Sequence, residues 1–349
     1  MNRIKVGVVF GGMSTEHLVS IVSGNSVINN LNQEKYEISS IYISKEGIWY
    51  IYNGRDKKYQ VGDQVSDIKK IGDVFEYLKT LDVVFPVLHG LYGEDGTIQG
   101  MFELLKVPYV GCKVLASSVG MDKVYTKIIF EKAGIKQAKY EYIRKNNNKY
   151  IYVAKDFTEK EYELKAICEL ISNKIKYPIF VKPSNSGSSV GINKAYNIQD
   201  LERHISHASK FDNKILLEET LIGREIECSV LGNEEVKASC VGEIKPADEF
   251  YSFDAKYNNA DSKLTIPAEI SEELANRVRE LAIKAFKSID GEGFARVDFF
   301  VNEEANEIYI NEINTIPGFT EISMYPKLWE ASGVKYPDLL EKLIKLAME

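Results

Sequence analysis

The sequence contains few cysteines and histidines, and this scarcity excludes the commonest zinc, disulfide and redox sites. It has only four of each in 349 residues. The cysteines form no C-x-x-C pair, so neither a zinc cluster nor a disulfide framework is predicted. The histidines form no H-E-x-x-H motif. We expect reduced, mostly buried cysteines at Cys112, Cys168, Cys228 and Cys240.

The chain also lacks long apolar runs and an excess of basic residues. No stretch approaches the ~20 apolar residues of a membrane span, and the apolar part of "MNRIKVGVVFGG" is too short for a signal peptide. A cytoplasmic protein is therefore expected. The formal net charge of −7 argues against a nucleic-acid partner, because such proteins carry clustered Lys and Arg.

Both widespread phosphate-binding motifs are missing. The stretch "GVVFGGMSTEH" lacks the second and third glycines of G-x-G-x-x-G, which argues against a dinucleotide-dependent dehydrogenase. The motif G-x-x-x-x-G-K-[ST], which defines the usual P-loop, does not occur. A nucleotide site in this chain therefore has to be built from other residues.

What is present is an alternation of strands and helices in an ordinary globular composition. With 44% hydrophobic and 27% charged residues, a chain of this length predicts two or three domains. Residues 1–111 alternate apolar strands with helical stretches, which predicts a doubly wound α/β domain. Residues 112–217, with a helix expected at 121–134 and the connector "RKNNNK", predict a smaller α+β unit. Residues 218–349 are expected to form a third unit.

The predicted third unit contains a hairpin that brings three oxygen ligands together. In "NEIYINEIN", Glu312 and Asn314 are two positions apart on a predicted strand and share a face. The predicted partner strand "FARVDFF" supplies Asp298. Ligand sets made only of oxygen suit Mg²⁺. Taken alone, a motif this short also fits a solvated strand end.

A second loop has the composition of a phosphate loop. "KPSNSGSSVG" places Lys182 at the end of a strand, followed by small residues that let backbone N–H groups and hydroxyls approach phosphate oxygens. Taken alone, a Ser/Gly loop also fits a flexible turn. A strand-end lysine, a glycine loop and a downstream acidic hairpin together predict an ATP site without either common motif.

These motifs resemble the ATP-grasp superfamily and, within it, the D-alanine–D-alanine ligase family. The resemblance covers nearly the whole chain, least at 45–75 and 140–170. It implies an α/β protein whose ATP-binding part is α+β: an ATP-grasp fold preceded by a doubly wound parallel sheet. It also implies ATP-dependent ligation of two D-alanines through an acyl phosphate, which supplies a peptidoglycan precursor. The matching stretches include "VVFGGMSTEHLVSIVSG", "FPVLHGLYGEDGTIQG", "VGMDKVYTK", "FVKPSNSGSSVGI", "LLEETLIGREIECSVLG", "FYSFDAKY" and "NEINTIPGFTEISMYP".

The resemblance implies roles for particular residues. ATP would be held by Lys123, Lys182, Ser189, Glu218, Glu219, Leu221 and Glu225. Two Mg²⁺ ions, replaceable by Mn²⁺, would bind Asp298, Glu312 and Asn314. The catalytic residues would be Glu16, Ser188, Tyr257, Arg296 and Gly318. D-alanine would be bound by His89, Lys256, Ser323 and Met324, with Glu94 supporting the lysines that hold phosphate.

Several of these residues also have simpler interpretations. Glu16 follows a glycine turn at a helix start, with Ser14 as the expected N-cap, and a carboxylate is stabilised there without any catalytic role. His89 fits equally a strand-end histidine that caps a turn. Glu219 fits a solvated strand end. Arg296 and Gly318 fit a surface arginine and an ordinary turn glycine, but an arginine beside a carboxylate in an apolar strand needs a partner.

The expected partners are D-alanine, ATP and a second copy of the chain in a homodimer, with no nucleic acid and no membrane. Three alternatives stay open. The second substrate could be D-serine or D-lactate, although Tyr257 argues against lactate. The chain could instead join a different acid and amine, or it could be a catalytically silent module that senses ATP. The intact residues Arg296, Asp298, Glu312 and Asn314 argue against the silent module.

Overall fold

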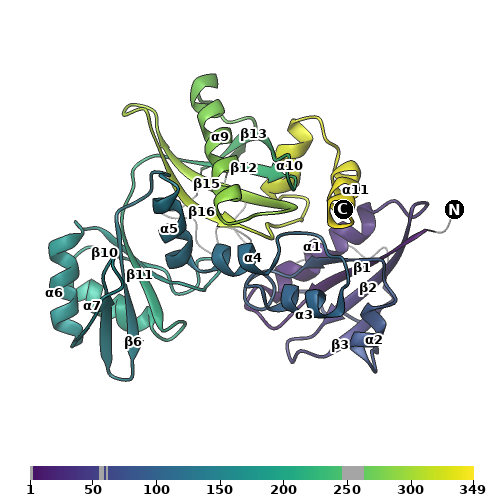
Figure 1. The fold of residues 1–349 in the computed structure, drawn as a ribbon, viewed down its shortest axis with the longest axis horizontal. Coiled ribbons are helices and arrows are strands. Elements are labelled where there is room, and N and C mark those ends of the chain that lie inside the picture. The colour runs from purple at the N-terminus through teal and green to yellow at the C-terminus, as the bar shows by residue number, and fades with distance from the viewer. Residues whose placement is uncertain (1–2, 55–58, 60–61, 246–262) are drawn as a thin grey trace.

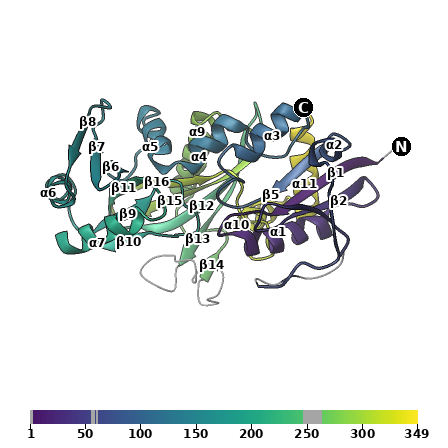
Figure 2. The ribbon, with the colours of Figure 1, turned by 90° about the horizontal axis from the view of Figure 1, so that it is seen from below.

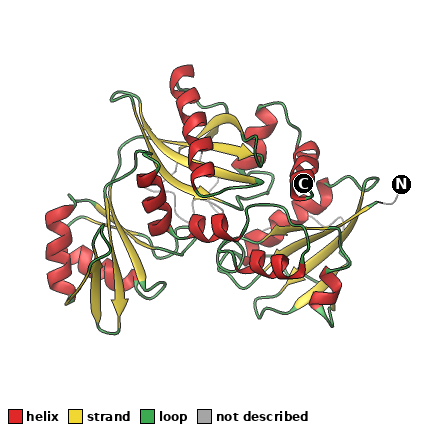
Figure 3. Cartoon of the chain, viewed as in Figure 1, coloured by secondary structure: helices red, strands yellow, loops and turns green. Residues whose placement is uncertain are grey.

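The structure is a computed structural model that describes residues 3–54, 59, 62–245 and 263–349. Its strands form three sheets, each covered by helices (Figures 1 and 3). The amino-terminal and central sheets lie at opposite ends of the molecule, with the carboxy-terminal sheet between them (Figure 2). The predicted site residues Lys256 and Tyr257 lie outside the described residues.

The amino-terminal sheet has the strand order β4-β3-β2-β1-β5. The predicted parallel strands form its core: β1 (Ile4–Gly11), β2 (Tyr36–Ile43) and β5 (Val83–Val87). Two antiparallel strands make the sheet mixed at one edge: β3 (Trp49–Tyr52) and β4 (Ile68–Lys70). Helices pack on both faces, as the doubly wound prediction requires: α1 (His17–Asn30) on one, α2 (Val74–Leu78) and α3 (Thr97–Leu105) on the other.

The last helix, α11 (Tyr336–Ala347), packs on this first sheet, although it ends the chain. Its apolar stripe repeats at helical spacing and is fully buried against α1 and β5. Figure 1 shows the yellow α11 beside the purple α1. The two ends of the chain therefore share one core, through Leu339, Leu340, Leu343 and Ile344.

The central sheet is antiparallel, with the order β10-β9-β11-β6-β7-β8. Its strands are β6 (Tyr140–Asn146), β7 (Lys149–Val153), β8 (Glu159–Tyr162), β9 (Ile179–Pro183), β10 (Asn193–Ala195) and β11 (Lys214–Glu219). One face is covered by α6 (Leu164–Lys174) and α7 (Ile198–Ala208). The stretch "RKNNNK" forms the tip of the β6–β7 hairpin rather than a connector: it ends β6, turns at Asn147 and Asn148, and begins β7. Asn147 takes the left-handed conformation that asparagine tolerates.

The carboxy-terminal sheet is also antiparallel, with the order β14-β13-β12-β15-β16. Its strands are β12 (Arg224–Leu231), β13 (Lys237–Lys245), β14 (Lys263–Thr265), β15 (Phe294–Asn302) and β16 (Glu307–Asn314). Helix α9 (Glu272–Ser288) covers one face, and α10 (Met324–Ala331) packs on β12 and β13. The predicted metal hairpin is β15–β16.

The helix expected at 121–134 is two helices, α4 (Val114–Met121) and α5 (Lys123–Lys132). Asp122 separates them because its backbone is extended and its side chain accepts the Val124 and Tyr125 N–H groups as the N-cap of α5. Both helices bury residues in the core of the carboxy-terminal sheet rather than the central one. The predicted unit boundaries differ accordingly: residues 112–135 pack with the third sheet, and β11 runs across the boundary at 217.

No helix in the described residues combines the length and the apolar character that a membrane crossing requires. All four cysteines are free, and all except Cys240 are buried.

Candidate active site

A cavity of about 930 Å³ lies where the three sheets meet. The central sheet contributes one wall and the carboxy-terminal sheet the opposite wall, and the loops after β1 and β5 close one end. Every predicted site residue that the structure describes lines this cavity. Residues scattered over some three hundred positions of the sequence are thus brought to one place.

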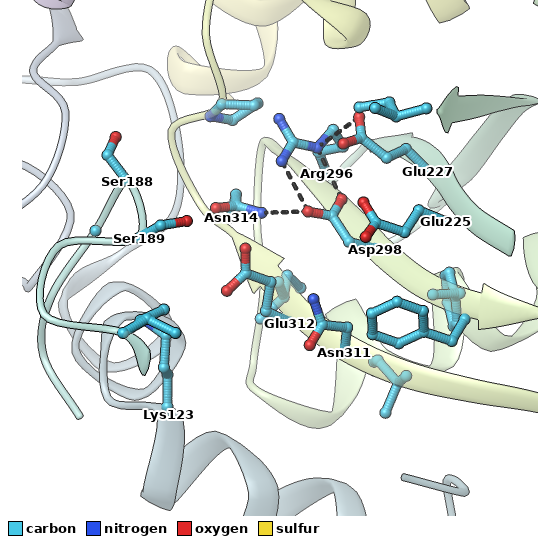
Figure 4. A pocket seen from close by; sticks show the side chains of 18 of the residues that line it. Lys123, Ser188, Ser189, Glu225, Glu227, Arg296, Asp298, Asn311, Glu312 and Asn314 are labelled. Carbon is cyan, nitrogen blue, oxygen red and sulfur yellow. Dashed lines mark hydrogen bonds and ion pairs between the residues drawn. The ribbon is translucent and has the colours of Figure 1, made fainter. Parts of the chain in front are cut away.

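The acidic wall is the β15–β16 hairpin (Figure 4). Asp298 pairs directly with Glu312, and Arg296 with Asn314. A register shift follows Asp298, so Phe299 pairs with Ile310 and Asn311 is the extra residue of a β-bulge.

The bulge resolves a conflict in the sequence pattern of β16. Ile308, Ile310 and Ile313 are all buried, yet Ile310 and Ile313 are three apart and would face opposite sides of a regular strand. The extra residue Asn311 turns Ile313 back to the core and Glu312 toward the cavity. The odd spacing of the isoleucines is the sequence signal for this bulge.

Arg296 is held between two carboxylates before any ligand binds. Its Nε and Nη2 atoms each donate to Asp298 at 2.7 Å, and Nε lies 2.9 Å from Glu227 Oε2. Burial alone would lower the pKa of Arg296, but the charges of Asp298 and Glu227 outweigh burial and raise it well above the ordinary value. The guanidinium is therefore charged and fixed in orientation. Sequence reasoning missed Glu227, although it pairs with Asp298 across β12 and β15.

The donor atoms of the hairpin fit a hard cation. Asp298 and Glu312 present carboxylates side by side, and the Asn314 amide donates through Nδ2 to Asp298 Oδ2 at 3.0 Å, so its oxygen remains an acceptor. Among the described residues no cluster of three or more His, Cys, Asp and Glu side chains is placed to hold a metal. The predicted ligand set, two carboxylates and an amide, is of the kind that Mg²⁺ completes with phosphates and water.

The basic wall belongs to the central sheet and to α5. Glu218 of β11 is buried and binds two lysines: Lys182 of β9 at Oε1, and Lys127 of α5 at Oε2, 2.9 Å away. Burial would raise the pKa of Glu218, but the two lysines lower it to about 2. Glu218 is predicted from resemblance to hold the nucleotide; in this structure it lines the cavity and its carboxylate binds both lysines. Lys127 was missed, although it lies one helical turn after Lys123.

The loop at 184–191 follows β9 of the central sheet and lines the cavity. Ser188 and Ser189 both have left-handed backbones, with φ of 47° and 60°, a strained conformation that clusters at functional sites. Lys123 Nζ donates to the carbonyl of Ser186 at 2.7 Å, which ties the start of α5 to this loop. Figure 4 shows the Ser188 and Ser189 side chains across the cavity from Asp298.

Glu16 joins three segments at the closed end of the cavity. Its carboxylate accepts the hydroxyl of Ser188, as predicted. Gly90 and Gly187 pack so closely on it that an added Cβ at either would overlap Glu16 Oε2. Ser14 is not the N-cap of α1: Glu16 takes that position, and the Ser14 hydroxyl accepts the Glu16 N–H and donates to the His89 carbonyl.

His89 and Glu94 lie beside Glu16. Both ring nitrogens of His89 are bonded within the protein, Nδ1 to Ile316 O at 3.1 Å and Nε2 to Ser23 Oγ at 3.0 Å, and burial lowers its pKa. Burial and then repulsion from Glu16 raise the pKa of Glu94 to about 8. Burial therefore favours the neutral form of both groups.

The far end of the hairpin leads into the start of α10. Ser323 Oγ accepts the Thr320 N–H at 2.9 Å and lies 2.6 Å from where a Cβ on Gly318 would be. The first N–H groups of α10, beginning at Met324, have no partner within the helix and favour an anion. This is the chemistry that a substrate carboxylate needs.

The opposite end of the cavity is formed by the turn after β11. Glu219 Oε1 accepts the Lys139 N–H at 2.8 Å, so this carboxylate is not simply solvated. Leu221 and Glu225 line the same end, and the neighbouring Ile222 is 82% exposed. An apolar and acidic edge of this kind can accept a flat, polar ring.

The fold and the cavity define a ligase of the ATP-grasp class, in which nucleotide and acid meet between two antiparallel sheets. The family model described as "D-ala D-ala ligase N-terminus" matches residues 5–112, and "D-ala D-ala ligase C-terminus" matches residues 129–345. The chain therefore belongs to the D-alanine–D-alanine ligase family.

Individual relatives agree with this membership. The D-alanine–D-alanine ligase of Acetivibrio thermocellus is 48% identical over 377 positions, covering 100% of this chain and 96% of the relative. That of Clostridium acetobutylicum is 51% identical, covering 98% and 97%. Among solved structures, the D-alanine–D-alanine ligase from Coxiella burnetii has a TM-score of 0.82 at 33% identity, covering 100% and 94%. The VanG D-Ala:D-Ser ligase from Enterococcus faecalis has a TM-score of 0.84 at 35% identity, covering 99% and 100%.

Proposed function

We propose that the protein joins two D-alanine molecules into D-alanyl-D-alanine with ATP, and so supplies a precursor of peptidoglycan. The observation that supports this proposal is the arrangement of charged residues around the cavity. The Glu218-bound lysines and the Asp298–Glu312 hairpin face one another across it, and the Glu16–Ser188 contact closes one end. A carboxylate, an amine and a triphosphate can meet there.

The reaction needs ATP because a carboxylate is a poor electrophile. The carboxylate oxygen of the first D-alanine attacks the γ-phosphorus, giving an acyl phosphate and ADP. The amine of the second D-alanine then attacks the acyl carbon, the C–N bond forms, and phosphate leaves with the C–O bond broken. The residues that would hold the triphosphate are Lys123, Lys182 and Ser189, with Glu218, Glu219, Leu221 and Glu225 at the adenosine end.

Two Mg²⁺ ions, or Mn²⁺ in their place, would neutralise the charge of the transferring phosphate when bound. Asp298, Glu312 and Asn314 would be their ligands. Arg296 is already neutralised by Asp298 and Glu227, so it adds a fixed donor to the site without an excess positive charge.

Four further assignments complete the proposal. Glu16, supported by Ser188, would bind the ammonium of the first D-alanine, with His89 beside it. Arg296 and the Gly318 N–H would stabilise the oxyanion of the tetrahedral intermediate. Ser323 and the start of α10 at Met324 would bind the carboxylate of the second D-alanine. Lys256 and Tyr257, which lie outside the described residues, are proposed from the resemblance to act from a loop closing over the cavity.

We also propose that the protein works in the cytoplasm as a homodimer. Free cysteines suit a reducing compartment. Leu104 of α3 and Leu115 of α4 are 87% and 59% exposed on neighbouring helices, and exposed apolar side chains suit a contact with a second copy.

The test is product formation from purified protein with ATP and Mg²⁺. D-alanine, D-serine and D-lactate are offered singly and in pairs, and released phosphate and joined product are both measured. We expect D-alanine alone to give equal amounts of phosphate and D-alanyl-D-alanine. A product containing D-serine or D-lactate in preference, or no D-alanine-dependent phosphate release, would contradict the proposal.

A further inference from the structure

Helix α1 carries two serines that reach the loop after β16. Ser23 is completely buried, and Ser26 lies one turn further along the same helix. Both connect to the backbone of Phe319, the residue after Gly318. The roles assigned above make no use of either serine.

The first connection has a defined direction. The Ile316 carbonyl can only accept, so His89 Nδ1 carries the proton and donates to it at 3.1 Å. Burial lowers the pKa of His89, which leaves Nε2 unprotonated to accept the Ser23 hydroxyl at 3.0 Å. Ser23 Oγ in turn accepts the Phe319 N–H at 3.4 Å. Every donor in this chain of bonds has an acceptor.

The second connection fixes the other side of the same residue. The hydroxyl of Tyr336 donates to the Phe319 carbonyl at 2.9 Å. Since that proton is used, Ser26 is the donor to Tyr336 across 3.2 Å. The Phe319 ring is fully buried against Phe85 and Phe294, with centroids 5.7 and 5.5 Å away.

We propose that Ser23 is a positioning residue, which through His89 and Phe319 holds the Gly318 N–H at a fixed place relative to Glu16. The proposal rests on the proposed function, in which Gly318 faces the oxyanion and Glu16 the first D-alanine. Both groups then depend on one rigid element, because Glu16 is the N-cap of α1 and Ser23 lies two turns further along. Tyr336 is the corresponding support on the carbonyl side of Phe319. A displacement of about 1 Å between such groups is enough to slow a reaction by about a hundredfold.

Ser20 provides the matched control. It is on the same helix, is equally buried, and also makes two hydrogen bonds, accepting the Gly11 N–H and donating to the Val87 carbonyl. Those bonds join β1 and β5 and do not reach the loop at 316–319. Removing either hydroxyl leaves a buried backbone N–H with a lost partner, so the two substitutions cost comparable stability.

The experiment compares Ser23→Ala, Tyr336→Phe and Ser20→Ala in the full-length protein. We expect Ser23→Ala to lower kcat about 10- to 100-fold, with KM for ATP changed less than about twofold, because the oxyanion support is lost and the nucleotide site is intact. The ratio of phosphate to dipeptide should rise above the wild-type value, since an acyl phosphate that waits longer for the amine is lost to water. Tyr336→Phe keeps the ring and should show the same ratio change with a smaller loss in kcat. Ser20→Ala should keep the wild-type ratio and a kcat within about twofold.

Two results would overturn the inference: wild-type ratios and kcat in both Ser23→Ala and Tyr336→Phe, or losses no different from those of Ser20→Ala. If Ser23→Ala does not fold, the ratio of phosphate to dipeptide in Tyr336→Phe is the test, and a wild-type ratio there would overturn the inference. A wild-type protein that makes no dipeptide would instead contradict the proposed function, so the two failures are distinguishable.

Discussion

At the residue scale, the site is built from charges that are already paired. Arg296 lies between Asp298 and Glu227, and Glu218 lies between Lys127 and Lys182. Paired buried charges cost less to desolvate, and their geometry is fixed before substrate arrives. A change to one member of a pair therefore affects the orientation of its partner as well as its own function.

Glu312→Gln tests the proposed metal site. One ligand oxygen becomes part of a neutral amide of nearly the same shape, so we expect kcat to fall by at least about a hundredfold while the protein unfolds cooperatively near the wild-type midpoint. Glu307→Gln, on the same strand but paired with Lys136 at the surface, is the control and should keep full activity. Near-normal turnover of Glu312→Gln would disprove the metal assignment.

Glu218→Gln tests the buried triad and its pH dependence. Replacing the carboxylate leaves two lysines against a neutral amide and should lower the free energy of unfolding by about 3–5 kcal/mol at pH 6. The pKa of Glu218 in the folded protein, about 2, is below its unfolded value. Its contribution is therefore present above about pH 4.3 and is lost as the pH falls toward 2.

The free energies of unfolding of wild type and Glu218→Gln should therefore differ less at pH 3 than at pH 6. Urea unfolding of both proteins at the two pH values measures this difference. A difference of equal size at pH 3 and pH 6 would show that the lysine pairing does not stabilise the ionised carboxylate.

At the scale of elements, the start of α5 is the junction between the two ATP-grasp sheets. Asp122 caps α5, accepts the Ser184 hydroxyl at 2.6 Å and pairs with Lys214 of β11. Ser184 opens the phosphate loop, and the Lys123 N–H donates to its carbonyl at 3.1 Å. One carboxylate thus sets the position of a helix, a loop and a strand together.

Asp122→Ala should therefore act on both stability and nucleotide binding. We expect a loss of about 1–3 kcal/mol from the cap and the buried partners, and a KM for ATP raised severalfold because α5 and the phosphate loop are no longer joined. Ser271→Ala removes the N-cap of α9, whose side chain accepts the Leu274 N–H away from the cavity. It should cost about 1 kcal/mol without changing KM. Equal KM values in the two variants would exclude the joining role.

At the scale of the whole molecule, the two ends of the chain form one core. Helix α11 covers the same face of the first sheet as α1, and Lys35 binds Glu341 across 2.7 Å at its margin. The first and third sheets are therefore expected to unfold together. Their relative position, which brings Glu16 to the cavity, depends on this helix.

Leu340→Ala tests this coupling. A fully buried leucine truncated to alanine should lower the free energy of unfolding by about 2–5 kcal/mol. Unfolding followed at Trp49 in the first sheet and at Trp329 in α10 should show the same lowered midpoint. Met348→Ala, at an exposed position where α11 ends, should change stability by less than about 0.5 kcal/mol. Separate midpoints for the two tryptophans would contradict the shared core.

The local pieces of the site could be predicted because they are close in sequence. Asp298, Glu312 and Asn314 share one hairpin, and the period-2 pattern of a strand fixes which of them face the same way. The residues of the phosphate loop after β9 are also close together in the sequence. The contact between Glu16 and Ser188 spans 172 positions, and it was predicted only through resemblance to a family.

What the sequence by itself determined is the order of strands and helices, the acidic hairpin, the phosphate loop and the family. Only the tertiary structure decided that α11 covers the first sheet and that α4 and α5 belong to the core of the third sheet. It also decided that Glu218 is buried and binds Lys127 and Lys182. The physical reason is the distance along the chain over which each effect acts. Backbone periodicity and turn chemistry act over a few residues, whereas the choice of which apolar faces meet, and which buried charges pair, minimises the free energy of the whole chain.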